Sequence, residues 1–174
     1  QQLYTLEKLE TWFLDVVKQY EKWAKFQVEW KQQRNASIKE IPFPYEYREG
    51  QKDLVTSVYR TILRKKKLFI QAPTGVGKTM ATVFPAVKAV GEELGDKIFY
   101  LTAKTITRTV AEQAFQILRE KGLQIKAITL TAKEKICFCE QTECNPDYCP
   151  YAKGHYDRVN DAVYDMITGT NIMD

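Results

Sequence analysis

The stretch Ala72-Pro73-Thr74-Gly75-Val76-Gly77-Lys78-Thr79 decides the fold class of this 174-residue chain. It lies between a short apolar run, Leu68-Phe69-Ile70, and a segment with helical spacing from 79 to 90. Glycines let backbone N–H groups approach phosphate oxygens, and the N-terminus of the following helix adds partial positive charge. In such a loop Lys78 reaches the β- and γ-phosphates of a nucleotide, and the Thr79 hydroxyl binds Mg²⁺. The stretch therefore predicts a strand, a phosphate-binding loop and a helix that together hold a nucleotide such as ATP.

The loop departs from the strict G-x-x-x-x-G-K-[S/T] pattern because Ala72 replaces the first glycine. The alternative interpretation is an ordinary glycine-rich turn with a surface lysine. We disfavour it, because an expected strand precedes the loop, an expected helix follows it and the Gly-Lys-Thr triplet is intact. The candidate nucleotide-binding residues of the loop are Thr74, Gly75, Val76, Gly77, Lys78 and Thr79.

Short apolar runs alternate with helical patterns on both sides of this loop. This order predicts an α/β fold with a partial parallel sheet, flanking helices and right-handed crossovers. Pro85 is expected to kink its helix. A further amphipathic helix is expected from about 159 to a stop at Gly169. The expected strands are 68–70, 98–101 and 124–130, and the expected helices that accompany them begin at 51, 79 and 105.

A long N-terminal helix is predicted over 3–34, with an apolar stripe at alternating steps of three and four residues. Ile41-Pro42-Phe43-Pro44 ends it, because proline lacks a backbone donor and restricts the residue before it. We expect the stripe to pack on an upstream domain or on the domain formed by the residues that follow the helix. A short coiled coil is the alternative.

Four cysteines lie in the pattern C-x-C-x4-C-x4-C, at Cys137, Cys139, Cys144 and Cys149. No signal-peptide pattern or membrane-spanning run is present, so we expect a cytoplasmic protein and a metal or cluster site instead of disulfides. Zinc and iron–sulfur clusters both accept four cysteines. The 26 basic and 22 acidic residues give a net charge of +4, which permits a polyanionic partner without requiring one. The first residues, Gln1-Gln2-Leu3, suggest an internal cut or a processed start.

Three segments together resemble superfamily 2 helicases of the XPD/DinG branch. Residues 43–51 are similar to the Q motif, residues 72–79 to motif I, and residues 100–105 to motif Ia. The resemblance implies that Gln51 binds the adenine edge through its paired amide donor and acceptor, with Tyr47 and Arg48 as possible supports. The plain alternative is that Gln51 merely begins a helix. The resemblance also implies that the motif Ia region contacts the backbone of single-stranded DNA. The alternative is a turn between strand and helix that is capped by threonines. The residues concerned are Thr102, Lys104, Thr105 and Arg108.

The cysteine segment occupies the interval where this branch carries an iron–sulfur insert between motifs Ia and II. The resemblance therefore implies a 4Fe-4S cluster held by the four cysteines, and we favour it over zinc. Whether Cys137 and Cys139 are both ligands stays open, because only Phe138 separates them; His155 or an external group could complete the set. In the branch this lobe is a rigid wedge at the point of strand separation.

The resemblance covers about residues 41–168. It implies part of a RecA-like motor domain at 41–130 and an iron–sulfur insert with its following helix at 131–174, and the long N-terminal helix or linker expected from the apolar stripe completes the division at 1–40. The resemblance also implies the N-terminal part of an ATP-dependent DNA helicase with 5′-to-3′ polarity and a role in DNA repair. Motif II and a second motor domain are not found in the sequence, so this chain alone is expected to be inactive. The implied cofactors are ATP, Mg²⁺ and a 4Fe-4S cluster. The implied partners are single-stranded DNA, a duplex fork and the rest of the helicase chain, and an upstream nuclease domain is a further candidate. The alternatives are another P-loop NTPase or a non-catalytic nucleic-acid-binding module that is stabilised by zinc or an iron–sulfur cluster.

Overall fold

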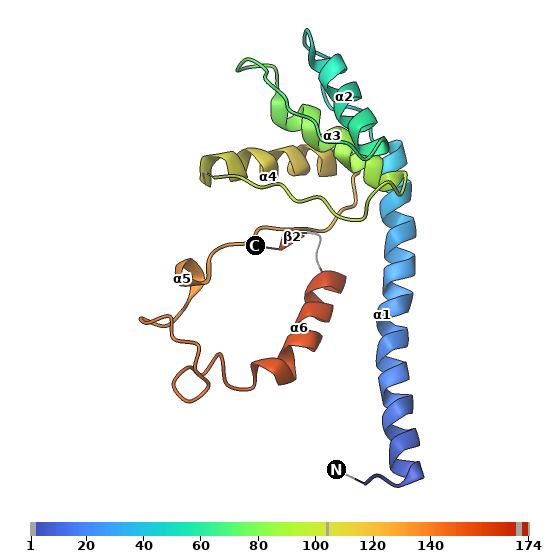
Figure 1. The fold of residues 1–174 in the computed structure, drawn as a ribbon, viewed down its shortest axis with the longest axis vertical. Helices are drawn as coiled ribbons and strands as arrows, with labels where there is room; N and C mark the ends of the chain where they lie inside the picture. Colours follow the sequence, from blue (N-terminus) through green and yellow to red (C-terminus); the bar gives the residue numbers. More distant parts are fainter. Residues whose placement is uncertain (1–2, 104, 170–171, 174) are drawn as a thin grey trace. The chain divides into compact units, whose positions relative to one another are not determined.

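The computed structural model describes residues 3–103, 105–169 and 172–173 (Figure 1). Its helices and strands are α1 (Leu6–Glu40), α2 (Gln51–Leu63), α3 (Lys78–Gly91), α4 (Thr105–Glu120), β1 (Ala127–Ile128), α5 (Lys133–Ile136), α6 (His155–Gly169) and β2 (Ile172–Met173). Among these residues, no helix combines the length and the apolar character needed to cross a membrane.

The chain forms two compact units, which are described separately. One unit is Val28–Gln124, and the other combines Gln1–Gln27 with Ile125–Asp174. The division predicted from the sequence, at 1–40, 41–130 and 131–174, stays a prediction.

The core of the unit Val28–Gln124 is built around α3, which packs against both α2 and α4 (Figure 1). A helix that is apolar on all sides belongs in a protein interior, and α3 fits that pattern because most of its side chains are buried. Pro85 lies inside α3, and the helix continues to Gly91. The smallest exposed fractions in this core belong to Ala81, Val83, Pro85, Val87, Ala89, Leu118 and Leu123, together with Ile38 and Ile41.

The C-terminal part of α1 belongs to this unit and lies against the end of α3. Ile38 is 1% exposed. A Cβ placed on Gly91 would come within 2.4 Å of the Ile38 Cγ2 atom, so the two helices approach closely only because Gly91 has no side chain. The Lys88 ammonium donates to the carbonyl oxygens of Ile38 (2.7 Å) and Lys39 (3.1 Å), which caps the end of α1. Partial burial lowers the pKa of Lys88.

The predicted parallel sheet is corrected by the structure. Residues 68–70 and 98–101 are assigned to no strand. Their side chains are largely exposed: Phe69 by 93% and Leu101 by 88%. A parallel strand is stable when neighbouring strands pair with it and helices cover both faces. Apolar composition alone does not supply that pairing. The one ladder in the described residues joins β1 to β2 in parallel, with Ala127 opposite Ile172.

The second unit contains the first part of α1 together with β1, α5, α6 and β2. Trp23 and Phe26 of α1 contact the ring of Tyr164 on α6 edge-on, with ring centroids 5.1 and 6.2 Å apart. The Lys22 ammonium lies 3.7 Å from the centre of the Tyr164 ring, within the range of a cation–π contact. The N-terminal end of the predicted apolar stripe is exposed, including Leu6, Leu9, Phe13, Val16 and Tyr20. The helix is longer than predicted and ends at Glu40, immediately before Ile41-Pro42.

Candidate nucleotide-binding site

The phosphate-binding loop leads directly into α3. Gly75 has φ 90° and Gly77 has φ 75°, a backbone region that favours glycine, and Gly77 is the N-cap of α3. A glycine at each of these positions allows the chain to turn sharply from the segment 68–71 into the helix. The first backbone N–H groups of α3 have no partners within the helix, so this end of α3 suits an anion.

Lys78 is the first residue of α3, and its side chain folds back over the loop. The ammonium donates to the carbonyl oxygens of Ala72 (2.9 Å) and Pro73 (2.7 Å). Phosphate oxygens are stronger acceptors for an ammonium than neutral carbonyls are. An incoming triphosphate can therefore take over these hydrogen bonds from the loop. Thr79 follows in the first turn of the helix and is half-buried. The roles of Lys78 and Thr79 toward phosphate and Mg²⁺ stay predictions.

Gln51 lies beneath the loop and is only 3% exposed. Its Oε1 atom accepts from the Arg48 backbone N–H at 3.1 Å, and its Nε2 atom donates to the Val76 carbonyl at 2.9 Å. A Cβ on Gly77 would lie 2.6 Å from the same Nε2 atom. The structure therefore places the Gln51 amide against the phosphate loop, and its predicted contact with adenine stays a prediction. The amide keeps a second N–H and a second lone pair for such a contact.

Arg48 contacts the loop from the same side, because its guanidinium donates to the Gly75 carbonyl. Tyr47, also considered as a support for Gln51, instead stacks on Phe43 with ring centroids 4.3 Å apart. Phe43 contacts Phe84 of α3 edge-on. The sequence gives no direct signal for the loop contacts of Gln51 and Arg48, because 25 to 27 residues separate the partners. They form because α2 packs on α3.

The residues predicted to contact single-stranded DNA lie at the start of α4. Lys104 is outside the described residues, and nothing is described for the side chain of Thr105, with which α4 begins. Thr102 is exposed and precedes the helix. Arg108 forms an ion pair with Glu112, one turn further along α4, at 3.4 Å. A DNA phosphate at Arg108 would compete with that carboxylate. These roles stay predictions.

The four cysteines of the second unit are free thiols. The Cys139 and Cys149 sulfurs are 4.0 Å apart, and Cys149 is buried. The backbone N–H of Ala152, followed by that of Tyr151, hydrogen-bonds the Cys149 sulfur and lowers its pKa. Burial, followed by hydrogen bonding to Cys149, raises the pKa of Cys139. The segment therefore places two sulfurs side by side whose pKa values are shifted in opposite directions.

A lysine lies among the same sulfurs. A hydrogen bond to the Cys144 sulfur raises the pKa of Lys133, and the nearby Glu134 carboxylate adds a smaller contribution of the same sign. As donors, the four thiols suit a soft metal or an iron–sulfur cluster. Among the described residues, however, no group of three or more side chains is arranged to hold a metal ion. The segment would have to close further to bind one.

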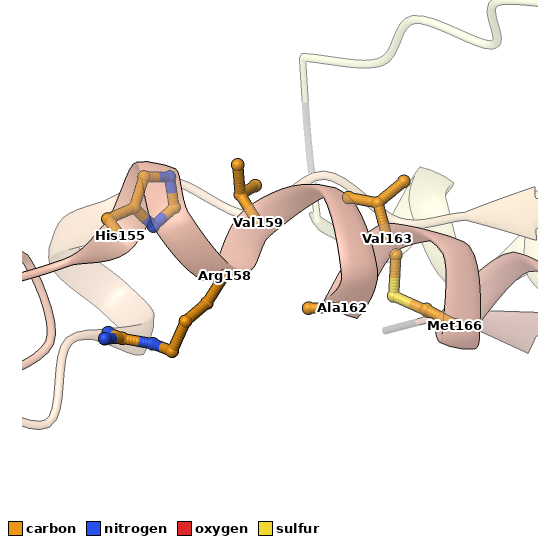
Figure 2. Close-up of a pocket in the computed structure, with 6 residues that line it drawn as sticks. All are labelled: His155, Arg158, Val159, Ala162, Val163 and Met166. Carbon is orange, nitrogen blue, oxygen red and sulfur yellow. The ribbon is translucent and has the colours of Figure 1, made fainter. Parts of the chain in front are cut away.

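His155, the alternative ligand, lies at the start of α6. It contacts the Tyr156 ring edge-on, with ring centroids 5.3 Å apart. Figure 2 shows it at one end of an open hollow along α6, together with Arg158; the remaining lining residues are Val159, Ala162, Val163 and Met166. This hollow is mainly apolar and offers no arrangement suited to phosphate or metal. The phosphate loop with Gln51 and Arg48 is therefore the candidate functional site.

Comparison with known proteins identifies a family and a curated relative. The DEAD/DEAH box helicase family matches residues 51–144, a range that includes Gln51 and the phosphate loop. A protein named "Probable ATP-dependent helicase" from Methanocaldococcus jannaschii is 34% identical over 113 residues. The alignment covers 64% of this chain and 17% of that relative's length. No solved structure gives a significant match.

The family match supports a superfamily 2 helicase domain and suggests a RecA-like fold. It also implies a nucleotide-binding domain that uses ATP and Mg²⁺, in agreement with the geometry of the loop. With more than half of its residues inside the match, the chain belongs to the DEAD/DEAH box helicase family.

Proposed function

We propose that this chain is the ATP-binding part of the first motor domain of an iron–sulfur DNA helicase of the XPD/DinG type. The observation that carries the proposal is the loop at the start of α3. It combines two glycines with positive φ, the Lys78 ammonium and the buried Gln51 amide. The match to the DEAD/DEAH box helicase family over residues 51–144 supports the helicase part of this proposal.

The expected chemistry of the loop follows from its groups. The Lys78 ammonium moves from the Ala72 and Pro73 carbonyls to the β- and γ-phosphates of ATP, while Thr79 contributes a hydroxyl to Mg²⁺. Phosphoryl transfer also needs an acidic residue that positions water and metal, and charge stabilisation from a second motor domain. We propose that other parts of the same protein supply them, in keeping with the short share of the relative's length that this chain spans.

The remaining parts of the proposal concern DNA. Thr102, Lys104, Thr105 and Arg108 contact the backbone of a single strand, and ATP-driven movement along it proceeds 5′ to 3′. A cluster bound by Cys137, Cys139, Cys144 and Cys149 would make a rigid lobe at the fork. Four soft sulfur donors within thirteen residues suit such a cluster, and a segment this small has too little apolar area to hold itself rigid.

The experiment that tests this function is ATP hydrolysis by the complete protein with and without single-stranded DNA. We expect DNA to stimulate hydrolysis, and we expect Lys78→Ala to abolish turnover while DNA binding persists. Lys97→Ala removes an equal charge from an exposed position outside the loop and should hydrolyse ATP normally. Full turnover in Lys78→Ala, or hydrolysis indifferent to DNA, would contradict the proposal and favour a different P-loop NTPase.

A further inference from the structure

Three helices of the unit Val28–Gln124 end in the same hydrogen-bonded turn. After α2, the Lys66 N–H donates to the Thr61 carbonyl and the Lys65 N–H donates to the Ile62 carbonyl. The ends of α3 and α4 repeat this pair of bonds, through Leu94 and Glu93 and through Leu123 and Gly122. This is the Schellman motif, in which the residue just past the helix has positive φ and is usually glycine.

The residue at the positive-φ position differs among the three turns. It is Gly122 after α4, Glu93 after α3 (φ 59°) and Lys65 after α2 (φ 53°). A side chain at this position strains the backbone, so a non-glycine residue there calls for an explanation. Glu93 has one within the chain, because its carboxylate accepts from Lys31 at 2.8 Å and from Asn35 at 3.3 Å. Lys65 has no comparable partner among the described residues.

Lys65 lies within an exposed basic cluster, which we define as Arg60 and Arg64–Lys67. Helix C-termini favour cations, but that effect is confined to the last turn and explains Arg60 and Arg64 only. Lys66 and Lys67 lie beyond it. The sequence around the cluster carries only positive charge: seven of the 26 basic residues and none of the 22 acidic residues lie between Leu54 and Gly91. In the described residues, no ion pair neutralises the cluster.

We propose that this basic cluster binds the phosphate backbone of a nucleic acid. It would be a contact separate from the nucleotide loop, because Gln51 touches the loop at the first residue of α2, whereas the cluster lies in the last turn of α2 and just beyond it. Thirteen helical residues span about 20 Å. Exposed lysines neutralise backbone phosphates and require no particular base sequence. The inference rests on the proposed function, since it assumes that the protein acts on nucleic acid.

The test is a fluorescence-anisotropy titration of the complete protein with labelled single-stranded and duplex oligonucleotides at several salt concentrations. For Lys66→Gln/Lys67→Gln we expect affinity near 0.15 M salt to fall about fivefold per lost phosphate contact. The slope of log affinity against log salt should become shallower by about 0.7–0.9 per contact. ATP affinity should not change. The matched control is Lys97→Gln/Lys121→Gln, which removes two exposed charges elsewhere in the same unit.

The variant Lys65→Gly distinguishes an effect on nucleic-acid binding from an effect on protein stability. It relieves the positive φ, so the thermal midpoint should rise while nucleic-acid affinity falls. Unchanged affinity and salt slope in Lys66→Gln/Lys67→Gln would overturn the inference, as would an equal loss in the control pair. Displacement by poly-glutamate as effective as by oligonucleotide would instead assign the cluster to an acidic protein. If the wild-type protein binds no nucleic acid at all, the proposed function itself has failed.

Discussion

Gly77 is the residue at which the loop, α3 and Gln51 meet. Its neighbour Gly75 has a similar backbone conformation, with φ 90° against 75°, but nothing lies within 4 Å of a Cβ placed there. At Gly77 the same Cβ would lie 2.6 Å from the Gln51 Nε2 atom. The pair therefore separates the effect of backbone strain from the effect of a steric overlap.

We expect Gly75→Ala to lower the free energy of unfolding by about 1–2 kcal/mol, which is the strain of alanine at positive φ. Gly77→Ala carries the same strain and adds about 1–3 kcal/mol for the overlap with Gln51. It should also displace the loop and abolish ATP binding. Urea unfolding and nucleotide titration measure both effects. If the overlap is responsible, Gly77→Ala should cost less stability in a Gln51→Ala background than alone. Strict additivity would contradict the contact.

At this scale the sequence predicts the chemistry of the loop but not its supports. The Gly-x-Gly-Lys-Thr spacing places Lys78 and Thr79 at the start of a helix, where the structure has them. Gln51 was expected to face a nucleotide, and the structure has its amide bonded to Val76 and Arg48. A contact across 25 residues depends on how two helices pack, which a local pattern does not encode.

Helices and strands differ in how well local pattern predicts them. The periodic spacing predicts the observed start of α4 at Thr105 and places the end of α6 at Gly169. A helix satisfies its own backbone hydrogen bonds, so its sequence contains most of the information needed. The segments 68–70 and 98–101 have the composition of strands but no ladder. A strand depends on neighbours that are distant in sequence, so composition alone cannot establish it.

The contact between α1 and α3 gives a prediction at the scale of elements. In an open helix, Gly91→Ala would stabilise by about 1 kcal/mol. Here the new methyl would overlap Ile38, at 2.4 Å from Cγ2 and 2.9 Å from Cβ. Overpacking of this kind costs about 1–3 kcal/mol. We therefore expect a net loss of up to about 2 kcal/mol in urea unfolding, and a smaller loss in an Ile38→Ala background.

Gly169→Ala is the matched control for this prediction. Gly169 is the last residue of α6, and nothing lies within 4 Å of the position that its Cβ would take. It should leave stability unchanged or slightly higher. A loss as large as that of Gly91→Ala would mean that glycine matters at both helix ends for a reason other than the approach of α1 to α3.

At the scale of the whole molecule, the two units differ in how they can be held together. Val28–Gln124 has a continuous apolar core around α3. In residues 131–154, Cys149 is the only buried residue, and aromatic side chains such as Phe138 and Tyr148 are 86% and 77% exposed. A segment of this size without a core needs a metal or cluster to fix it. The cysteine spacing predicts such a group, but not which one.

The metal content of protein prepared without oxygen distinguishes a 4Fe-4S cluster from a zinc ion. A 4Fe-4S cluster predicts about four iron and four sulfide per chain and a brown colour. Two sulfurs bound to one tetrahedral zinc ion at about 2.3 Å would lie close to the 4.0 Å that separates Cys139 from Cys149, so zinc is the competing outcome. We expect iron, and we expect Cys144→Ser to lose the colour and become sensitive to protease within residues 131–154. Cleavage inside 28–124 should stay unchanged, because that unit has its own core. Two results would contradict the iron–sulfur cluster: zinc in the purified protein, or no metal together with a segment 131–154 that is equally resistant to protease. Neither result would affect the proposed role of the nucleotide loop.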